Sequence, residues 1–438
     1  MKLEECGKTK TFPQKQGVDI LKKLVIKGGN KLTGTIKIGG AKNSVVALLP
    51  AAILSNSNCT IKNVPNISDV HKLNEMLEIL GAKVEYEKGI IKLDTKNIEN
   101  KEIDEYHANS IRASYYFMGA LLGKYHKAEI SMPGGCVIGS RPIDLHIKAF
   151  EKLGAKVKLK DNKYTITAKK LVGADIYLDF ASVGATVNTM LAAVLAEGIT
   201  KIFNAAKEPE IENVADFLKS MGAKICGVGT STIIIEGVKE LTSGNIEVIP
   251  DRIETGTYLM IGMLLGKNLV IEGVSLKNLD AVISKLKETG ARFKIDHNKI
   301  YVTATRKLKP VNVKTEVYPG FPTDLGQPMS TLLTQCKGES LFQETIYENR
   351  MRHIPHLNEM GANIKTFDNN AVIKGKTKLR GREVIATDLR AGAAMMVAGM
   401  IAKGTTTITN IEHILRGYEN IVDKLSNVGA DIKLIEED

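Results

Sequence analysis

The chain has 438 residues, 43% of them hydrophobic and 25% charged, and a formal net charge of +11 at pH 7. This length exceeds what one hydrophobic core usually supports, so we expect two domains. The five cysteines are scattered, odd in number and without a Cys-x-x-Cys pair, which argues against a disulfide framework and a zinc site and indicates a reducing cytoplasm.

The positive charge is spread along the chain rather than gathered in one segment. Lysines occur singly or in pairs, and there is no Trp and few other aromatic residues on which bases could stack. This distribution weighs against nucleic-acid binding and favours small anionic ligands held by a few convergent cations. Residues 1–22 lack an apolar segment, and no apolar run in the chain is long enough to span a bilayer, so we expect no membrane insertion and no export.

From the N-terminus onward, one pattern recurs six times: an amphipathic helix, a glycine that ends it, and a pair of alternating strands. Gly at this position adopts the left-handed conformation that ends helices. The spacings between successive glycines are 73, 68, 68, 71 and 68 residues. The six glycines are Gly81, Gly154, Gly222, Gly290, Gly361 and Gly429.

Between these units lies a second recurring element, a polar turn followed by an apolar helix rich in Ala and Gly. The turns begin near residues 41, 110, 181, 251, 322 and 387. Helices this apolar must be buried in the middle of a domain. Ser, Asn and Asp in the turns are ordinary N-caps, and each taken alone is more often a cap than a ligand-binding group. Cations at a helix N-terminus oppose the dipole, so Lys42, Arg112, Arg252 and Arg390 suggest that anions bind there. Six such units predict two similar α/β domains, three units each, around a cleft.

The segment from Pro133 to His146 combines a cysteine with glycines, an arginine, a carboxylate and an imidazole. Its glycines and Pro142 favour a loop, which is the usual place for reactive groups. We therefore predict a chemical role for Cys136. Free cysteines are more often buried small hydrophobes, and we expect that for Cys59, Cys226 and Cys336.

Ten motifs in a fixed order extend from about residue 24 to the C-terminus. They are GAKNS (40–44), SIRAS (110–114), PGGCVIGSRPIDLH (133–146), SVGAT (182–186), NAAKEPEI (204–211), PDRIETGT (250–257), FPTD (321–324), ENR (348–350), ATDLRA (386–391) and RGYE (416–419). Together they closely resemble the UDP-N-acetylglucosamine enolpyruvyl transferase family. The resemblance implies an inside-out α/β barrel fold, with two domains of three βαβαββ units. It places the first domain at residues 43–250 and the second at residues 23–42 plus 251–438, after an N-terminal extension of unknown role at residues 1–22.

The resemblance also implies an activity: transfer of the enolpyruvyl group of phosphoenolpyruvate to the 3-hydroxyl of UDP-N-acetylglucosamine, with release of phosphate. Cys136 would donate a proton to the donor's CH₂ carbon, and Asp324 would accept the proton of the sugar hydroxyl. From spacing alone, Asp324 is as well explained by an N-cap. The catalytic set would be Cys136, Asp324, Lys42 and Arg416.

Two substrate-binding sets follow from the same resemblance. Phosphoenolpyruvate would contact Lys42, Asn43, Arg141, Arg350, Arg390 and Arg416. UDP-N-acetylglucosamine would contact Asn43, Arg112, Arg141, Pro142, Ile143, Asp144, Leu145, Ser182, Val183, Gly184, Asp324 and Ile346. His146 follows this group, and a structural role for it is as well supported as a functional one.

We expect no cofactor and no metal, because the histidines form no HxH or HExxH pattern and arginine and lysine supply the positive charge. Three other functions are considered. The first is the sister activity, which uses shikimate 3-phosphate as acceptor, but the family with that activity lacks this cysteine loop. A nucleic-acid binder is disfavoured by the scattered lysines. A catalytically idle relative is disfavoured by the complete catalytic set. The oligomeric state cannot be inferred from the sequence.

Overall fold

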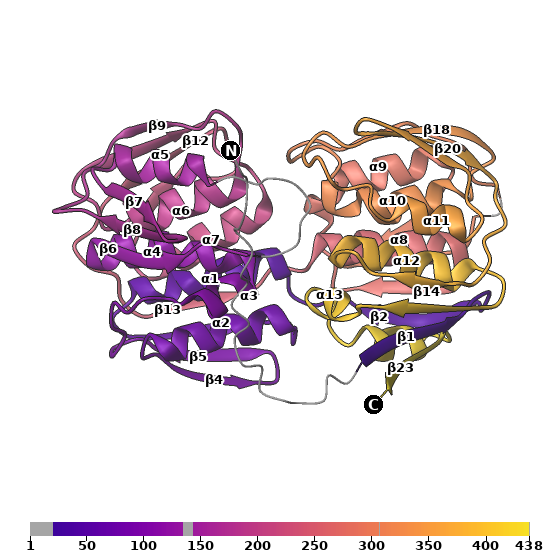
Figure 1. Ribbon diagram of the computed structural model, residues 1–438, viewed down its shortest axis with the longest axis horizontal. Coiled ribbons are helices and arrows are strands. Elements are labelled where there is room, and N and C mark those ends of the chain that lie inside the picture. Colours follow the sequence, from indigo (N-terminus) through magenta and orange to yellow (C-terminus); the bar gives the residue numbers. More distant parts are fainter. Residues whose placement is uncertain (1–20, 135–142, 306, 438) are drawn as a thin grey trace, which may run out of the picture.

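The computed structural model describes residues 21–134, 143–305 and 307–437, which form two lobes side by side (Figure 1). The hydrophobic core of the first lobe is built from residues between 41 and 248. The core of the second lobe combines residues 24–38 with residues 253–432. Each lobe therefore buries its own core, and the N-terminal strands β1 and β2 lie in the second lobe.

Six sheets are found among the described residues, three in each lobe. In the first lobe the strand orders are β13-β3-β5-β4, β6-β8-β7 and β11-β12-β10-β9. The strands of this lobe are β3 (Asn58–Lys62), β4 (Lys83–Glu87), β5 (Ile90–Asp94), β6 (Lys127–Ser131), β7 (Lys156–Lys160), β8 (Lys163–Thr167), β9 (Asp175–Tyr177), β10 (Ile199–Phe203), β11 (Lys224–Cys226), β12 (Thr232–Glu236) and β13 (Gly244–Glu247).

In the second lobe the strand orders are β15-β16-β14-β2, β17-β18-β20-β19 and β21-β22-β1-β23. Its strands are β1 (Leu21–Lys27), β2 (Leu32–Lys37), β14 (Gly266–Glu272), β15 (Phe293–Asp296), β16 (Lys299–Val302), β17 (Val313–Lys314), β18 (Gly338–Gln343), β19 (Ile364–Phe367), β20 (Asn370–Gly375), β21 (Glu383–Ile385), β22 (Thr405–Thr409) and β23 (Asp431–Glu437). In five of the six sheets one pair of strands is parallel and the other pairs are antiparallel.

The apolar helices lie in the middle of each lobe, as predicted. In the first lobe they are α1 (Lys42–Ala51), α4 (Tyr116–Tyr125) and α6 (Val183–Ala193), and in the second α8 (Arg252–Leu265), α10 (Gly326–Leu333) and α12 (Leu389–Ile401). Almost every residue of these helices is buried. Their N-termini face the space between the lobes, because residues at or just before those N-termini line one shared cavity.

The amphipathic helices each bury one face and expose the other. They are α2 (Ser68–Ile79), α5 (Asp144–Lys152), α7 (Pro209–Ser220), α9 (Asp280–Glu288), α11 (Ile354–Glu359) and α14 (Ile421–Ser426). The short helices α3 (Glu105–Ser110) and α13 (Glu412–Leu415) and the 3-10 turns η1 (Ala52–Leu54), η2 (Arg112–Tyr115), η3 (Leu276–Asn278) and η4 (Thr323–Leu325) complete the described helical elements. All six repeat glycines have φ between 95° and 108°, which confirms their predicted role in ending these helices.

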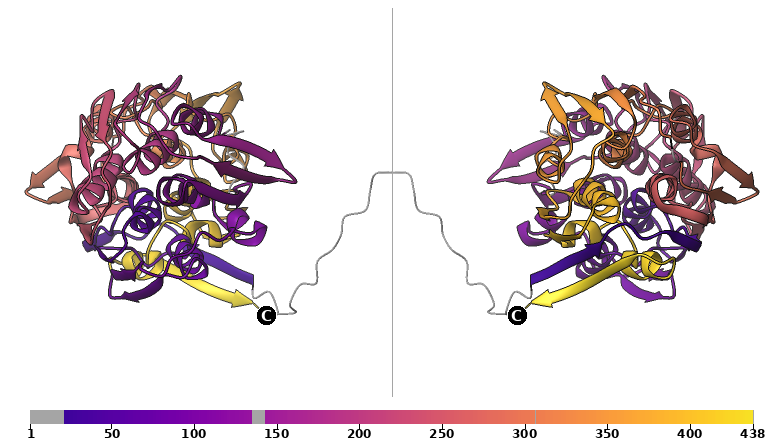
Figure 2. Two further views of the ribbon diagram at one scale, coloured as in Figure 1. Left: turned by 90° about the vertical axis from the view of Figure 1, so that its left-hand side faces the viewer. Right: turned by 90° about the vertical axis from the view of Figure 1, so that its right-hand side faces the viewer.

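The two chain crossings between the lobes run side by side. Gly40 and Pro250 form an antiparallel bridge, and the amide N–H groups of Ala41 and Asp251 donate to Ile249 and Gly39 at 2.7 and 3.0 Å. At the far end of the second lobe β1 pairs with β23, so the first and last described strands are neighbours (Figure 2).

Two local expectations are tested by the structure. Ser182, Asp251 and Asp388 do act as N-caps, through backbone N–H bonds at the starts of α6, α8 and α12. Cys59 and Cys336 are buried, but Cys226 is exposed, so its predicted burial is wrong. Cys226 ends β11, where the alternation of a strand turns it away from the core. No helix among the described residues is long and apolar enough to cross a membrane.

Candidate functional site

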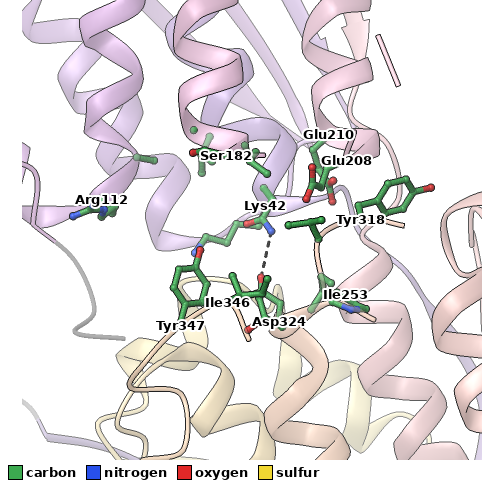
Figure 3. Close-up of a pocket in the computed structure, with 18 of the residues that line it drawn as sticks. Lys42, Arg112, Ser182, Glu208, Glu210, Ile253, Tyr318, Asp324, Ile346 and Tyr347 are labelled. Atoms are coloured by element: carbon green, nitrogen blue, oxygen red, sulfur yellow. Dashed lines mark hydrogen bonds between the residues drawn. The ribbon is translucent and has the colours of Figure 1, made fainter. Parts of the chain in front are cut away.

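A cavity of about 630 Å³ lies between the lobes and is lined by residues of both. Figure 3 shows Lys42 of the first lobe above Asp324, Ile346 and Tyr347 of the second lobe, with Arg112 to one side and Glu208, Glu210 and Tyr318 to the other. Its size lies within the range usual for small-molecule sites. The convergent helix N-termini and cations give it the character of an anion site.

One cluster of charges joins the two lobes across this cavity. Asp69 of α2, with 1% of its side chain exposed, lies 2.8 Å from Lys42 Nζ and 2.8 Å from Arg416 Nε. Burial alone would raise the pKa of Asp69, but the charges of Lys42 and Arg416 outweigh it and keep the pKa below its ordinary value. A carboxylate of the protein therefore occupies the position between these two cations.

A second cluster lies on the second lobe around Asp324. Its carboxylate oxygens accept hydrogen bonds from Arg350 Nη2 at 2.7 Å and Arg390 Nη2 at 3.0 Å. Asn43 of the first lobe adds a longer bond, from Nδ2 to Asp324 Oδ2 at 3.4 Å. Burial would raise the pKa of Asp324, but Arg390 and Arg350 hold it well below its usual range. No side-chain cap is found on the turn that contains Asp324, so the alternative reading of it as an N-cap is wrong.

A third cluster surrounds Arg252 at the start of α8. Its guanidinium donates to Glu210 Oε1 at 3.0 Å and Oε2 at 3.4 Å, and it lies 5.4 Å from the centre of the Tyr318 ring. Burial raises the pKa of the neighbouring Glu208, although the charge of Arg252 opposes that effect. The cation at this helix N-terminus is thus balanced by an acidic residue of the first lobe.

His146 is held by a chain of hydrogen bonds that fixes its tautomer. The N–H of Gly119 donates to Asn188 Oδ1 at 3.0 Å, so the other end of the amide is the donor. Asn188 Nδ2 then donates to the carbonyl of Tyr115 at 3.1 Å and to His146 Nδ1 at 2.8 Å. An Nδ1 that accepts carries no proton, so the ring proton is on Nε2. That edge of the ring lies against Gly184, where an added Cβ would lie 3.0 to 3.1 Å from the ring and 2.9 Å from Tyr115 Oη.

We predict that His146 stays neutral, with its proton on Nε2, throughout pH 5 to 9. Burial, with a smaller contribution from the charge of Arg112, lowers the pKa of His146 to about 3. Nitrogen NMR shifts of a histidine-labelled sample measure both the protonation state and the tautomer. Asn188→Ala removes the donor to Nδ1 and is expected to mix the two tautomers. A wild-type signal that shows a protonated Nδ1 in this range would contradict the assignment.

The structure brings together nearly all the described residues that the sequence singled out. The following line the cavity: Lys42, Asn43, Arg112, Asp144, Leu145, Ser182, Val183, Gly184, Asp324, Ile346, Arg350, Arg390 and Arg416. Ile143 is the exception, because it is 7% exposed and packs in the core of the first lobe. Cys136, Arg141 and Pro142 lie outside the described residues.

The acidic partners of these cations could not be recognised in the sequence. Asp69 follows Ser68 at the start of a helix, where an acidic residue is ordinary. Glu210 is likewise in the first turn of α7. The one available signal was the set of cations at helix N-termini, which implied nearby anions without saying that the protein supplies them. Within the described ranges, no group of three or more His, Cys, Asp or Glu side chains is arranged to hold a metal ion.

Residues 26–425 match the family described as EPSP synthase (3-phosphoshikimate 1-carboxyvinyltransferase). The chain belongs to this carboxyvinyltransferase family. Within it, the chain is 50% identical over 422 residues to UDP-N-acetylglucosamine 1-carboxyvinyltransferase 2 of Lactococcus lactis, covering 95% of this chain and all of that one. It is also 50% identical over 413 residues to the protein of that name from Bacillus subtilis, covering 94% and 96%.

Solved structures agree with the fold. The enolpyruvyl transferase NikO from Streptomyces tendae has a TM-score of 0.88 at 25% identity, over 96% of this chain and 100% of that one. EPSP synthase from Acinetobacter baumannii has a TM-score of 0.72 at 18% identity, over 94% and 100%. The predicted enolpyruvyl transferase fold is confirmed. In this chain the cavity lies where the two lobes meet.

Proposed function

We propose that the protein transfers the enolpyruvyl group of phosphoenolpyruvate to the 3-hydroxyl of UDP-N-acetylglucosamine and releases phosphate. This is the first committed step of peptidoglycan synthesis, and it takes place in the cytoplasm. The observation that carries the proposal is the pairing of two cation sets, Lys42 with Arg416 and Arg350 with Arg390, in one cavity between the lobes. We also propose that the domain boundaries lie near residue 42 and near residues 250–251.

The two cation sets match the two charged groups of the donor. Lys42 and Arg416 come from different lobes and lie against one carboxylate, so they can hold a phosphate in its place. Arg350 and Arg390 both bind Asp324 through guanidinium groups, whose planar geometry suits a substrate carboxylate. The reaction also needs an acid for the CH₂ carbon, a role we assign to Cys136, and a base for the hydroxyl.

Asp324 becomes a competent base only when its arginines are engaged elsewhere. With both guanidinium groups against it, the low pKa of this carboxylate makes it a poor proton acceptor. A substrate carboxylate that binds Arg350 and Arg390 would weaken both contacts and raise that pKa. Binding of the donor would therefore prepare the base.

For the acceptor, the first lobe offers a polar and an apolar side. The start of α6, at residues 182–184, presents backbone N–H groups to the cavity, and Arg112 lies nearby, which suits a diphosphate. Leu145 supplies an apolar wall for a uracil ring, and Ile346 of the second lobe lies near Asp324, where the sugar would be placed. We propose no cofactor.

The decisive assay is phosphate release from phosphoenolpyruvate, measured with UDP-N-acetylglucosamine, with shikimate 3-phosphate, and with neither. The proposal expects release only with the nucleotide sugar. Release only with shikimate 3-phosphate would assign the sister activity. Release with neither acceptor, from a folded protein, would mean that the chain is not a transferase of this kind.

We predict that Asp69→Asn tightens the binding of inorganic phosphate. The variant removes the carboxylate that competes for Lys42 and Arg416, so affinity should rise by about tenfold, the size of one charged hydrogen bond. Calorimetric titration of phosphate measures this directly. Asp179→Asn is the matched control, because Asp179 also lines the cavity but pairs with Lys148 instead. Weaker phosphate binding by Asp69→Asn would show that Asp69 positions the two cations rather than competing for them.

A further inference from the structure

A second cavity, of about 730 Å³, lies in the second lobe at the opposite ends of the same central helices. The last residues of α8 and α12, Leu265 and Ile401, line it, together with Gln335 just beyond the end of α10. Because α12 has 13 residues, this cavity is about 20 Å from the cleft between the lobes. It is therefore separate from the candidate active site.

The lining of this cavity is strongly cationic. Lys31, Lys376, Lys378, Arg380 and Lys403 contribute to it, and no lining residue is acidic. None of these five side chains forms an ion pair with a carboxylate of the described residues, although many other lysines of the chain do. All five side chains are exposed, so water and salt screen their mutual repulsion, and an anion bound between them would remove the part that remains.

The first lobe has the same backbone arrangement at the corresponding place. In the second lobe Lys403 forms a β-bridge with Arg380, and its N–H donates to the carbonyl of Leu379; in the first lobe Glu197 does the same with Val172 and Leu171. In the first lobe, however, the side chain of Glu197 forms an ion pair with Lys170 at 2.8 Å. The matching side chains of the second lobe, Lys378, Arg380 and Lys403, are all cations.

The centre of the first lobe is also filled by its own chain. Lys124, at the end of α4, donates from Nζ to the carbonyls of Ile53 and Ser55 at 2.6 and 2.8 Å. The matching position in the second lobe, after Leu332-Leu333-Thr334, is the neutral Gln335, which donates instead to Thr377. The second lobe thus has no ammonium group at the position that matches Lys124, and the cavity lies there.

The helix ends do not oppose an anion as strongly as bare carbonyls would. Near the end of α8 the carbonyl of Met263 accepts the N–H of Thr305 at 2.8 Å, and in α12 Met400 accepts that of Gly29 at 2.8 Å. These bonds satisfy part of the negative ends of the two helices. The charge at the mouth of the cavity is therefore set mainly by the lysines and the arginine.

We propose that this cavity is a second binding site, for a small molecule that carries several negative charges of the phosphate or diphosphate class. Its volume suits such a ligand, and the arrangement of cations from separate repeats suits several acidic oxygens. The lining holds no aromatic residue for stacking bases, which disfavours a single-stranded nucleic acid. The inference does not depend on the proposed function.

The test uses inorganic pyrophosphate as the probe and an amine-reactive reagent read by mass spectrometry. Pyrophosphate is expected to slow the modification of Lys376, Lys378 and Lys403 in the full-length protein. Because the modification of each lysine is measured separately, pyrophosphate bound in the cleft between the lobes does not affect this readout. No protection of these lysines would overturn the proposal. Protection by phosphatidylglycerol vesicles but not by pyrophosphate would assign the patch to a membrane surface and overturn it as well.

Two variants make the test specific. Lys403→Glu restores the arrangement of Lys170 and Glu197, so it should fold normally and raise the pyrophosphate concentration that protects Lys378 by about tenfold or more. If its unfolding temperature falls, Lys378→Gln with Arg380→Gln replaces it, with Lys376 as the reporter. Glu197→Lys is the matched control, because it gives the first lobe a lysine at the position that matches Lys403. In that lobe Lys124 fills the centre. Unchanged protection in Lys403→Glu, or equal protection of Lys170 in Glu197→Lys, would overturn a built site.

Discussion

Replacing Asp324 with asparagine is expected to lower turnover by about 10²- to 10⁴-fold, the range typical of losing a general base. Asparagine keeps the shape of the side chain and can still accept a hydrogen bond, but it cannot take the proton of the sugar hydroxyl. Steady-state kinetics separate the effects, because the loss should appear in kcat with only a modest change in the affinity for UDP-N-acetylglucosamine. Phosphate release under saturating substrates is the direct measurement.

The matched control for this variant is the loss of a carboxylate that acts only as an N-cap. Asp104→Ala removes a carboxylate that accepts the backbone N–H of His107 at the start of α3, and Asp104 does not line the cavity. It should cost about 1 kcal/mol of stability, as N-caps do, and affect turnover far less. If Asp324→Asn shows this second behaviour instead, with stability lowered and turnover kept, then the proton of the hydroxyl leaves by another route.

The repeat architecture could be predicted because each unit carries local signals. A glycine that ends a helix needs a positive φ, and all six repeat glycines have one. Helices without a polar face can only be buried, and the six central helices are buried. These signals are short-range, so they can be recognised in one sequence without knowledge of which units become neighbours.

The charge balance of the cavity could not be predicted in the same way. Asp69 and Arg416 are 347 residues apart in the chain, and they meet only because the two lobes face each other. The bond between Asn43 and Asp324 spans 281 residues. Sequence patterns indicated that cations gather at helix N-termini, but nothing local distinguishes an acidic partner such as Asp69 from an ordinary residue in a first helical turn.

The three acidic partners suggest a common principle for this site. Asp69, Glu210 and Asp324 each neutralise a cation or pair of cations, so the cleft can bury strong positive charge without a ligand. We expect a substrate anion to exchange places with a carboxylate of the protein when it binds, so that it does not enter an unbalanced field. The affinity for each anion is then the difference between two charged interactions, which is smaller than either and favours product release.

Replacing Cys136 with alanine is expected to remove most turnover, by about 10²-fold or more, whereas Cys136→Asp should retain much of it. The proposed role requires an acid that can deliver a proton to the CH₂ carbon of the donor, and a carboxylic acid can do this as a thiol does. Both variants are measured by phosphate release across pH 5 to 9. The aspartate variant should lose activity as pH rises, because only its protonated form can donate.

Asp324→Asn and Cys136→Ala together test whether the two groups act on separate protons. If one donates to the donor and the other accepts from the acceptor, exchange of deuterium from solvent into the CH₂ group should fail in Cys136→Ala and persist in Asp324→Asn. Cys226→Ala is the matched control, since Cys226 is an exposed thiol at the end of β11 and does not line the cavity. Equal activities of Cys136→Ala and Cys136→Asp would remove the thiol from the proton transfer and leave the cations of the cleft as the principal source of catalysis.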